Sequence, residues 1–241
     1  MRSHNLDNFE VIILCGGEGK RLRPVTEKIP KPMVQIKDKP ILYYILDYLH
    51  SYGIKNFIIS TGYKHEMVEK YIRDNHNDKN IKVINTGKTD IINRIKDAGK
   101  LIKKDFLVLY GDTISDVDLN KLVMFHKDKE LPATMTVWPM RSQFGLVDFD
   151  KNGRVVSFLE KPILDKFMNI GYFYFKNEIL KIMQKYLSWE LFLDDIVKMQ
   201  ILNAYMHNGL HITVNTIEEL YQAEKNIENL NFKKKYELLE K

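Results

Sequence analysis

Short apolar runs alternate with longer helix-like segments along the first half of the chain. The apolar runs occupy residues 11–14, 57–61, 81–85 and 106–110. Runs of this length and composition are typical of strands that are buried on both faces. Segments with helical periodicity lie between them, at residues 40–53, 65–74 and 89–102. Because strands alternate with helices of this length, the pattern predicts right-handed βαβ units and a parallel sheet covered on both faces.

The second half of the chain is richer in strand-like segments. A helix is expected at residues 116–129, with Asp116 and Asp118 as capping residues. Strand-rich segments follow at residues 133–140, 144–161 and 168–175, and the stretch DKNGR within them predicts a hairpin turn. Two helical stretches, a short strand at 211–216 and a helix from Thr216 complete the pattern. We therefore expect one α/β domain over residues 1–241 with a mixed, mostly parallel sheet, divided into halves at about 8–130 and 131–220 and followed by a C-terminal helix at 216–241.

Composition narrows the class of protein. The 241 residues include a single cysteine, Cys15, so an internal disulfide is excluded. No apolar stretch approaches the roughly 18–20 residues that span a bilayer, and the N-terminus lacks the apolar core of a signal peptide. These features predict a cytoplasmic protein without a membrane partner. The net charge is +5, but the densest cationic run, at residues 232–241, is interleaved with glutamates and is typical of a solvated helix end, so no nucleic-acid partner is expected.

One loop has an unusual composition. Residues 14–33 read LCGGEGKRLRPVTEKIPKPM, with three glycines, five cations and three prolines directly after the first expected strand. The carboxyl edge of a parallel sheet is where open α/β folds bind ligands, and successive glycine N–H groups can cradle phosphate oxygens. The pattern fits neither the dinucleotide fingerprint nor the P-loop, because Leu22 stands where a third glycine is needed and Arg21 follows Gly19-Lys20. Arg21 and Lys31 are suited to hold phosphates, one bidentately and one as a point charge.

This loop resembles the GGxGxRLxPxTxxxPKPM signature of the sugar-1-phosphate nucleotidyltransferases. Later segments follow in the order found in that family, including YGDTISDVDLNKLVMFHK, QFGLVDFDKNGRVVSFLEKP, MNIGYFYF and LHITVNTIEEL. The run from GYK through NTGKTD, YGD and FGLVDFD to SWE looks most like the glucose-1-phosphate cytidylyltransferases. The resemblance implies a Rossmann-like fold whose first half binds a nucleoside triphosphate, CTP by preference, and whose second half binds a small phosphorylated acceptor.

The resemblance also implies site residues. An acceptor phosphate oxygen attacks the α-phosphorus of the triphosphate, which requires positioning and charge neutralisation more than a protein nucleophile. Arg21 would bind the departing pyrophosphate, Lys31 the α-phosphate, and Asp112 a Mg²⁺ ion, although an aspartate after a strand is also a common turn former. The nucleotide-binding residues implied are Leu14, Cys15, Gly16, Gly17, Gly19, Lys20, Gly62, Tyr63, Thr86, Gly87 and Gly111. Steric accommodation rather than reactivity is expected for Cys15.

Acceptor binding is implied for Glu160, Lys161 and Asn169. Lys161 would meet the acceptor phosphate, and Glu160 a hydroxyl or amine. Without the resemblance, Glu160 and Lys161 would be read as a surface charge pair that contributes little.

Two positions depart from the family pattern. Asn215 stands where a second metal-binding aspartate is usual, so an amide oxygen is expected at the metal. Ile92-Asn93 replaces a Gly-Gly pair, and Ile92 is expected to crowd a pyranose. The chain is similar to cytidylyltransferases that act on phosphoglutamine in capsule polysaccharide biosynthesis, so phosphoglutamine is the expected acceptor and CDP-glutamine the product. A sugar-1-phosphate nucleotidyltransferase and a non-catalytic nucleotide-binding relative remain alternatives, and a homo-oligomer is possible.

Overall fold

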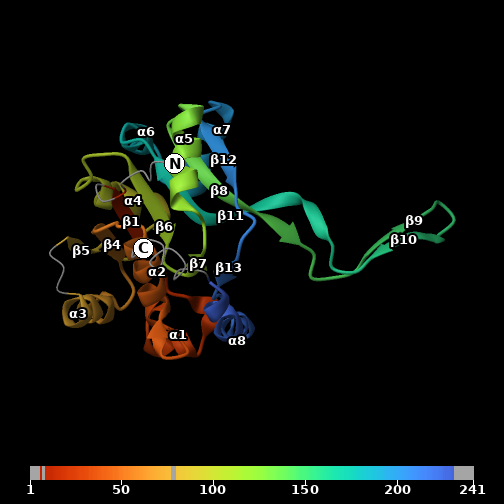
Figure 1. The fold of residues 1–241 in the computed structure, drawn as a ribbon, viewed down its shortest axis with the longest axis horizontal. Helices are drawn as coiled ribbons and strands as arrows, with labels where there is room; N and C mark the ends of the chain where they lie inside the picture. The colour runs from red at the N-terminus through yellow and green to blue at the C-terminus, as the bar shows by residue number, and fades with distance from the viewer. Residues whose placement is uncertain (1–5, 7–8, 77–79, 231–241) are drawn as a thin grey trace, which may run out of the picture.

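A seven-stranded sheet forms the centre of the computed structural model, which describes residues 6, 9–76 and 80–230 (Figure 1). Across the sheet the strands run in the order β12 (Leu202–Met206), β8 (Ala133–Arg141), β11 (Ile163–Phe175), β6 (Phe106–Tyr110), β1 (Glu10–Cys15), β4 (Asn56–Thr61) and β5 (Ile81–Asn85). β11 is antiparallel to both of its neighbours, and the other neighbouring pairs are parallel. The mixed, mostly parallel sheet expected from the sequence is confirmed.

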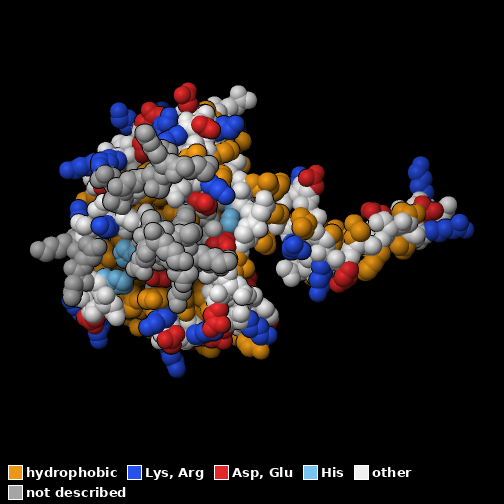
Figure 2. Space-filling model, in the orientation of Figure 1, with side chains coloured by type: hydrophobic (Ala, Val, Ile, Leu, Met, Phe, Trp, Pro, Cys, Tyr) orange, Lys and Arg blue, Asp and Glu red, His pale blue; other side chains and the backbone are white. Residues whose placement is uncertain are grey.

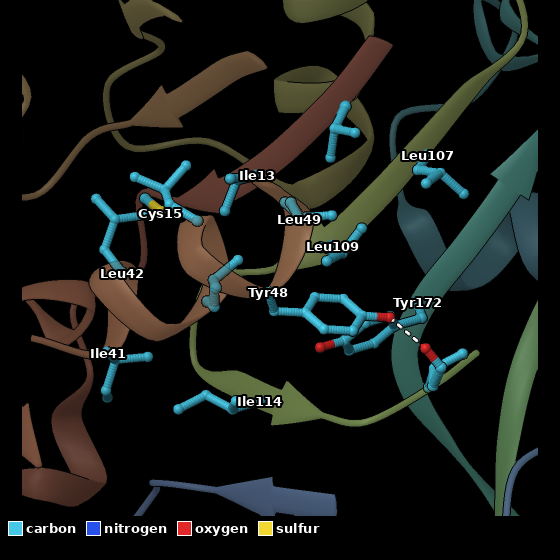
Figure 3. Packing of buried hydrophobic residues seen from close by; sticks show 14 of the residues in the cluster. Ile13, Cys15, Ile41, Leu42, Tyr48, Leu49, Leu107, Leu109, Ile114 and Tyr172 are labelled. Carbon is cyan, nitrogen blue, oxygen red and sulfur yellow. Dashed lines mark hydrogen bonds between the residues drawn. The ribbon is translucent and has the colours of Figure 1, made fainter. Parts of the chain in front are cut away.

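Alternate side chains of the strands enter two separate cores. Ile13 of β1 and Leu109 of β6 belong to the core beneath α2 (Ile41–Ser51) and α5 (Leu119–Lys129), part of which Figure 3 shows. Their neighbours Ile12 and Val108 belong to the opposite core, beneath α4 (Ile91–Gly99), α6 (Ile179–Met183) and α7 (Trp189–Lys198). Strands with apolar residues on both faces are therefore buried on both faces, as the continuous apolar runs indicated.

Further helices and short strands surround the sheet. They are η1 (Lys20–Leu22), α1 (Val25–Lys28), η2 (Lys31–Met33), β2 (Gln35–Ile36), β3 (Lys39–Pro40), α3 (His65–Asn75), β7 (Thr113–Ser115), β13 (His211–Thr213), α8 (Ile217–Asn226) and η3 (Ile227–Asn229). β7 pairs antiparallel with β13, and Thr113 lies opposite Thr213. Because Asp112 precedes Thr113 and Asn215 follows Thr213 by two residues, this pairing brings two distant parts of the chain together beside the end of β6.

The helix ends confirm some expectations and correct others. Asp118 caps α5 by accepting hydrogen bonds from two backbone amides, and Thr216 caps α8. Asp116 is not a cap, because its carboxylate accepts from Leu210 N at 2.7 Å and lies 3.1 Å from His207 Nε2. α8 ends at Asn226 instead of continuing, since the chain tightens into η3 and buries Ile227. The cationic run at 232–241 lies outside the described residues.

A two-stranded ribbon extends away from the sheet (Figure 1). It consists of β9 (Leu146–Phe149) and β10 (Val155–Leu159), which pair antiparallel beyond the ends of β8 and β11. The predicted hairpin turn is present between them: Asp150 accepts from two backbone amides, and Gly153 has a φ of 78°. Within the described residues, no helix has the length and apolar character that crossing a bilayer requires.

The burial of His126 leads to a prediction of how the free energy of unfolding depends on pH. Its ring is 1% exposed, shares a hydrogen bond of 2.8 Å between Nδ1 and Thr134 Oγ1, and lies against Tyr174. Burial lowers the pKa of His126 from 6.5 to about 4. As pH falls from 6.5 towards 4, protons therefore bind the unfolded chain in preference to the folded one. We expect the free energy of unfolding to fall by on the order of 1 kcal/mol through this group between pH 7 and pH 5, as measured by urea titration.

The variant His126→Asn, which retains a polar atom towards Thr134, is expected to lose stability at pH 7 but to show a shallower pH dependence. His65→Asn at the start of α3 serves as the control. An unchanged pH slope in His126→Asn would contradict this assignment.

Candidate active site

A cavity of about 290 Å³ opens at the carboxyl ends of β1 and β6. This is the edge of the sheet at which the sequence placed a ligand. Its walls come from the loop after β1, the end of β6, the start of η2 and the first turn of α4. The lining residues are Leu14, Cys15, Gly16, Gly17, Lys31, Pro32, Thr89, Ile91, Arg94, Tyr110, Gly111 and Asp112.

The glycines that line the cavity are required for different physical reasons. A Cβ on Gly17 would meet no atom within 4 Å, so the backbone there is open. A Cβ on Gly16 would lie 1.7 Å from Arg94 Nη1, so Gly16 makes room for a side chain of the protein itself. At position 111 a Cβ atom would lie 2.7 Å from Cys15 Sγ, so a side chain does not fit there. Burial and the nearby charge of Asp112 raise the pKa of the Cys15 thiol, which fits the packing role expected of this residue.

Cationic and oxygen-bearing side chains meet beside the cavity, whose lining includes Lys31 and Asp112 but not Arg21 or Asn215. Lys31 Nζ donates to Asp112 Oδ2 at 2.5 Å and to Asn215 Oδ1 at 2.7 Å, and Arg21 Nη2 donates to the same amide oxygen at 2.8 Å. Lys31 is only 9% exposed, which strengthens its interaction with the carboxylate. Residues separated by up to 194 positions in the sequence thus form one polar cluster.

The amide of Asn215 has a defined orientation. Its Nδ2 donates to Thr213 Oγ1 at 2.7 Å, and its backbone N donates to Glu219 Oε2 at 2.6 Å. These bonds turn Oδ1 towards the two cations. Within the part of the chain that the structure describes, no group of three or more acidic, histidine or cysteine side chains could hold a metal ion, so Asp112 and Asn215 would have to share an ion with ligands from a substrate.

Arg94 is the most connected buried side chain at this edge of the sheet. It extends from α4, is 6% exposed, and donates to the carbonyl oxygens of Gly16 at 3.0 Å, Thr61 at 2.9 Å and Gly87 at 2.9 Å. A fourth bond, of 2.7 Å, goes to Thr86 Oγ1. The guanidinium therefore joins the chain segments at the ends of β1, β4 and β5. The four N–H groups of Nη1 and Nη2 thus have neutral oxygens as acceptors, and none of these acceptors is a carboxylate.

The residues expected to flank the base lie around Arg94, outside the cavity lining. A Cβ on Gly62 would be 2.4 Å from Gly87 O and 2.9 Å from Arg94 Nη1. Tyr63 donates its backbone N to Gly16 O and its hydroxyl to Thr26 O. Two other predicted residues also lie away from the lining. Lys20 is exposed and pairs with Glu18 at 3.3 Å, and Gly19 adopts a φ of 63° beside Thr26.

The expected acceptor residues are divided between two places. Asn169 lies in β11 beside Tyr110, which lines the cavity, and its Oδ1 accepts from Gly171 N at 2.8 Å. Glu160 and Lys161 lie in the turn between β10 and β11, both exposed, and neither lines the cavity. In a single chain the structure therefore does not bring this pair to the cluster at Asp112.

The expected crowding by Ile92 is wrong. Ile92 is fully buried in the core beneath α4, and it is the preceding residue, Ile91, that lines the cavity. Asn93 also turns away and donates to Thr89 Oγ1 at 3.0 Å. The helical rotation of about 100° per residue separates neighbouring side chains in this way, and residue alignment alone does not show it.

Arg94 was missed by the sequence analysis, although a signal exists. It occupies the helical stripe formed by Ile91, Ile95 and Ala98, which are one turn or two turns apart on one face of α4. A charged residue in an apolar stripe is a buried charge unless the stripe is solvated, and a buried charge must find partners.

The contacts of Arg94 predict coupling with Gly16. Arg94→Ala removes a charged donor and leaves buried carbonyls unpaired, so we expect a loss of about 2–3 kcal/mol in the free energy of unfolding. Gly16→Ala alone is expected to lose about 1–3 kcal/mol because its methyl group collides with the guanidinium. In the double variant the collision is absent, and the combined loss is expected to be at least about 1 kcal/mol smaller than the sum.

Urea unfolding of the four proteins measures this coupling. Gly17→Ala provides the matched control, because the position is open and its substitution is expected to cost less than about 0.5 kcal/mol. Strict additivity of Gly16→Ala and Arg94→Ala would show that contact with the Arg94 guanidinium does not explain the glycine at position 16.

Comparison with known proteins agrees with this geometry. The protein family described as Nucleotidyl transferase matches residues 10–229. D-glycero-alpha-D-manno-heptose 1-phosphate guanylyltransferase of Campylobacter jejuni is 32% identical over 222 residues, covering 88% of this chain and 97% of that protein. Glucose-1-phosphate cytidylyltransferase of Salmonella typhimurium is 31% identical over 239 residues, covering 88% and 93%.

Solved structures have the same fold. The crystal structure of HddC from Yersinia pseudotuberculosis has a TM-score of 0.70 and 28% identity, over 91% of this chain and 99% of that chain. UDP-glucose pyrophosphorylase complexed with UDP-glucose has a TM-score of 0.72 at 18% identity, over 92% and 98% of the two chains. The Rossmann-like fold of the nucleotide-diphospho-sugar transferases is thus confirmed. The chain belongs to the nucleotidyl transferase family, among the sugar-1-phosphate nucleotidyltransferases.

Proposed function

We propose that this protein is a cytidylyltransferase that transfers CMP from CTP to a small phosphorylated acceptor, with phosphoglutamine as the acceptor and CDP-glutamine as the product. The observation that carries the nucleotidyl transfer is the convergence of Arg21, Lys31, Asp112 and Asn215 beside a cavity whose lining includes Gly16, Gly17 and Gly111. Cytidine is supported by the cytidylyltransferases among the relatives, such as that of Salmonella typhimurium.

The reaction requires charge neutralisation. An oxygen of the acceptor phosphate forms a bond to the α-phosphorus, and the bond from that phosphorus to the bridging oxygen breaks, so that pyrophosphate leaves with the electron pair. Lys31 would donate to the α-phosphate and Arg21 to the departing phosphates, while the open backbone at Gly17 allows close approach of the triphosphate. No protein nucleophile is needed for this step.

A Mg²⁺ ion fits the donor set at this site. Magnesium is usually bound by one or two carboxylates together with substrate phosphates, and the oxygens of Asp112 and Asn215 already hold one cation, the ammonium of Lys31, between them. When bound, the ion would neutralise phosphate charge as a Lewis acid. Lys31 would then turn from Asp112 to the α-phosphate.

The acceptor is a separate part of the proposal. At the start of α4 the side chain of Ile91 lines the cavity, directly before positions 92 and 93, at which the family pattern has a glycine pair. An apolar wall favours an acceptor that makes no backbone contact there, as phosphoglutamine would. A sugar 1-phosphate is the second candidate, favoured by relatives named for heptose 1-phosphate and glucose 1-phosphate.

A matrix of nucleotides and acceptors tests both parts. We expect pyrophosphate release to be fastest with CTP and phosphoglutamine, and at least about tenfold slower when GTP, UTP or dTTP replaces CTP. Heptose 1-phosphate and glucose 1-phosphate complete the acceptor panel. Turnover with glucose 1-phosphate but not phosphoglutamine eliminates the proposed acceptor, and a preference for GTP eliminates cytidine. Nucleotide binding without turnover in any combination would favour a regulatory relative.

Substitutions at the proposed metal ligands test the mechanism. Asp112→Asn removes the only carboxylate of the cluster, and we expect kcat to fall by about 100-fold or more while the protein remains folded. Asn215→Asp adds a carboxylate, so half-maximal activity is expected at a lower Mg²⁺ concentration. Asp97→Asn, at an exposed pair with Lys100, is the control for loss of a surface carboxylate. A Mg²⁺ dependence in Asn215→Asp equal to that of the wild type would contradict a metal at this position.

A further inference from the structure

The ribbon and its base, residues 141–167, here called the arm, carry a concentration of exposed apolar side chains. Figure 2 shows apolar surface along its length. Ten of the 19 large apolar residues that are exposed in the described chain lie in the arm. They are Phe144, Leu146, Val147, Phe149, Val155, Val156, Phe158, Leu159, Ile163 and Phe167.

The apolar residues occupy both faces of the ribbon. Leu146 and Val147 are consecutive in β9, so they point to opposite faces, and their cross-strand partners are Leu159 and Phe158. Each of these four side chains is between 42% and 62% exposed. A two-stranded hairpin is marginally stable alone in water, and a stable ribbon normally buries at least one face. In this arm both faces carry apolar side chains that a partner surface would have to bury.

The area involved is larger than a single chain normally leaves uncovered. Phe144, Phe149, Phe158 and Phe167 are 76%, 71%, 62% and 50% exposed. At roughly 200 Å² for a whole aromatic side chain, these rings alone present on the order of 500 Å². The largest apolar patch on a typical monomer is about 300–600 Å², whereas a stable interface buries about 800 Å² per partner. With its six aliphatic residues the arm reaches the size of an interface.

The charges of the arm identify the kind of partner. Arg141, Lys151, Arg154, Lys161 and Lys166 are balanced by Asp148, Asp150, Glu160 and Asp165, although the whole chain has a net charge of +5. A nearly neutral surface with both signs interspersed is not repelled by a copy of itself, and it lacks the cationic excess that attracts an anionic membrane or a nucleic acid. A two-fold contact also lets each arm cover the other.

We propose that the arm is the interface through which two copies of this chain associate, with each arm packed against the arm of the other copy. The strands of the arm continue from β8 and β11, where Ile163 lies opposite Arg141 and Phe167 opposite Pro139, so the interface is held in position by the central sheet.

Sedimentation velocity of the full-length protein between 1 and 100 µM tests the proposal. We expect the wild type to sediment as a dimer or a larger even assembly. In the double variant Phe149→Glu/Phe158→Glu the dissociation constant of the assembly should rise at least about tenfold, so that more monomer is present at each concentration. Leu187→Glu is the matched control, because Leu187 is 81% exposed but lies outside the arm, and it should retain the assembly of the wild type.

Amide hydrogen exchange provides a second measurement that does not depend on a variant. The amides of the arm should become more protected at 100 µM than at 1 µM, while those of β1 and β6 remain unchanged. A wild type that is monomeric at 100 µM overturns the proposal, and so does an unchanged assembly in the double variant. If the chain is monomeric and the amides of the arm are protected, the arm folds onto its own chain. If the chain is monomeric and these amides are unprotected, the partner of the arm is a different protein.

Discussion

A buried guanidinium holds together the edge of the sheet at which the cavity opens. Arg94 bonds to oxygens at the ends of β1, β4 and β5, and its volume requires the absence of a side chain at Gly16. Strands of a parallel sheet all direct their carbonyl ends to the same edge, where the loops present unpaired acceptors. Five fixed donors on a planar group can satisfy several such loops at once, which a lysine could not do with the same geometry.

The polar cluster of Arg21, Lys31, Asp112 and Asn215 lies beside the same cavity as Arg94. Lys31 reaches Asp112 from η2, and Asn215 accepts from Lys31 and Arg21 because the pairing of β13 with β7 brings it there. Two cations share one amide oxygen and one carboxylate, so the cluster has positive charge to offer a polyanion. This is the electrostatic property that nucleotidyl transfer requires.

The sequence predicted this cluster more accurately than the rest of the site. The sequence predicts all four of its residues, Arg21, Lys31, Asp112 and Asn215. Each lies in a short segment with a strong pattern, such as the glycine-rich loop after the first strand or the YGD segment at the end of a later strand. Arg94 was missed and Ile92 misplaced, because burial on α4 depends on the rotation of a helix against a sheet. The acceptor residues Glu160 and Lys161 were expected near the cluster, but the arm holds them away from it in the single chain.

The sequence by itself determined the order of strands and helices, the mixed sheet, the cap at Asp118, the start of a helix at Thr216, and the glycine-rich, cationic composition of the first loop. These depend on local periodicity and on residues close together in the chain. Only the tertiary structure decided that Asp116 contacts Leu210, that Gly16 accommodates Arg94 and that apolar residues of the arm face outwards. Such contacts join residues far apart in sequence, and their geometry exists only after the sheet has assembled.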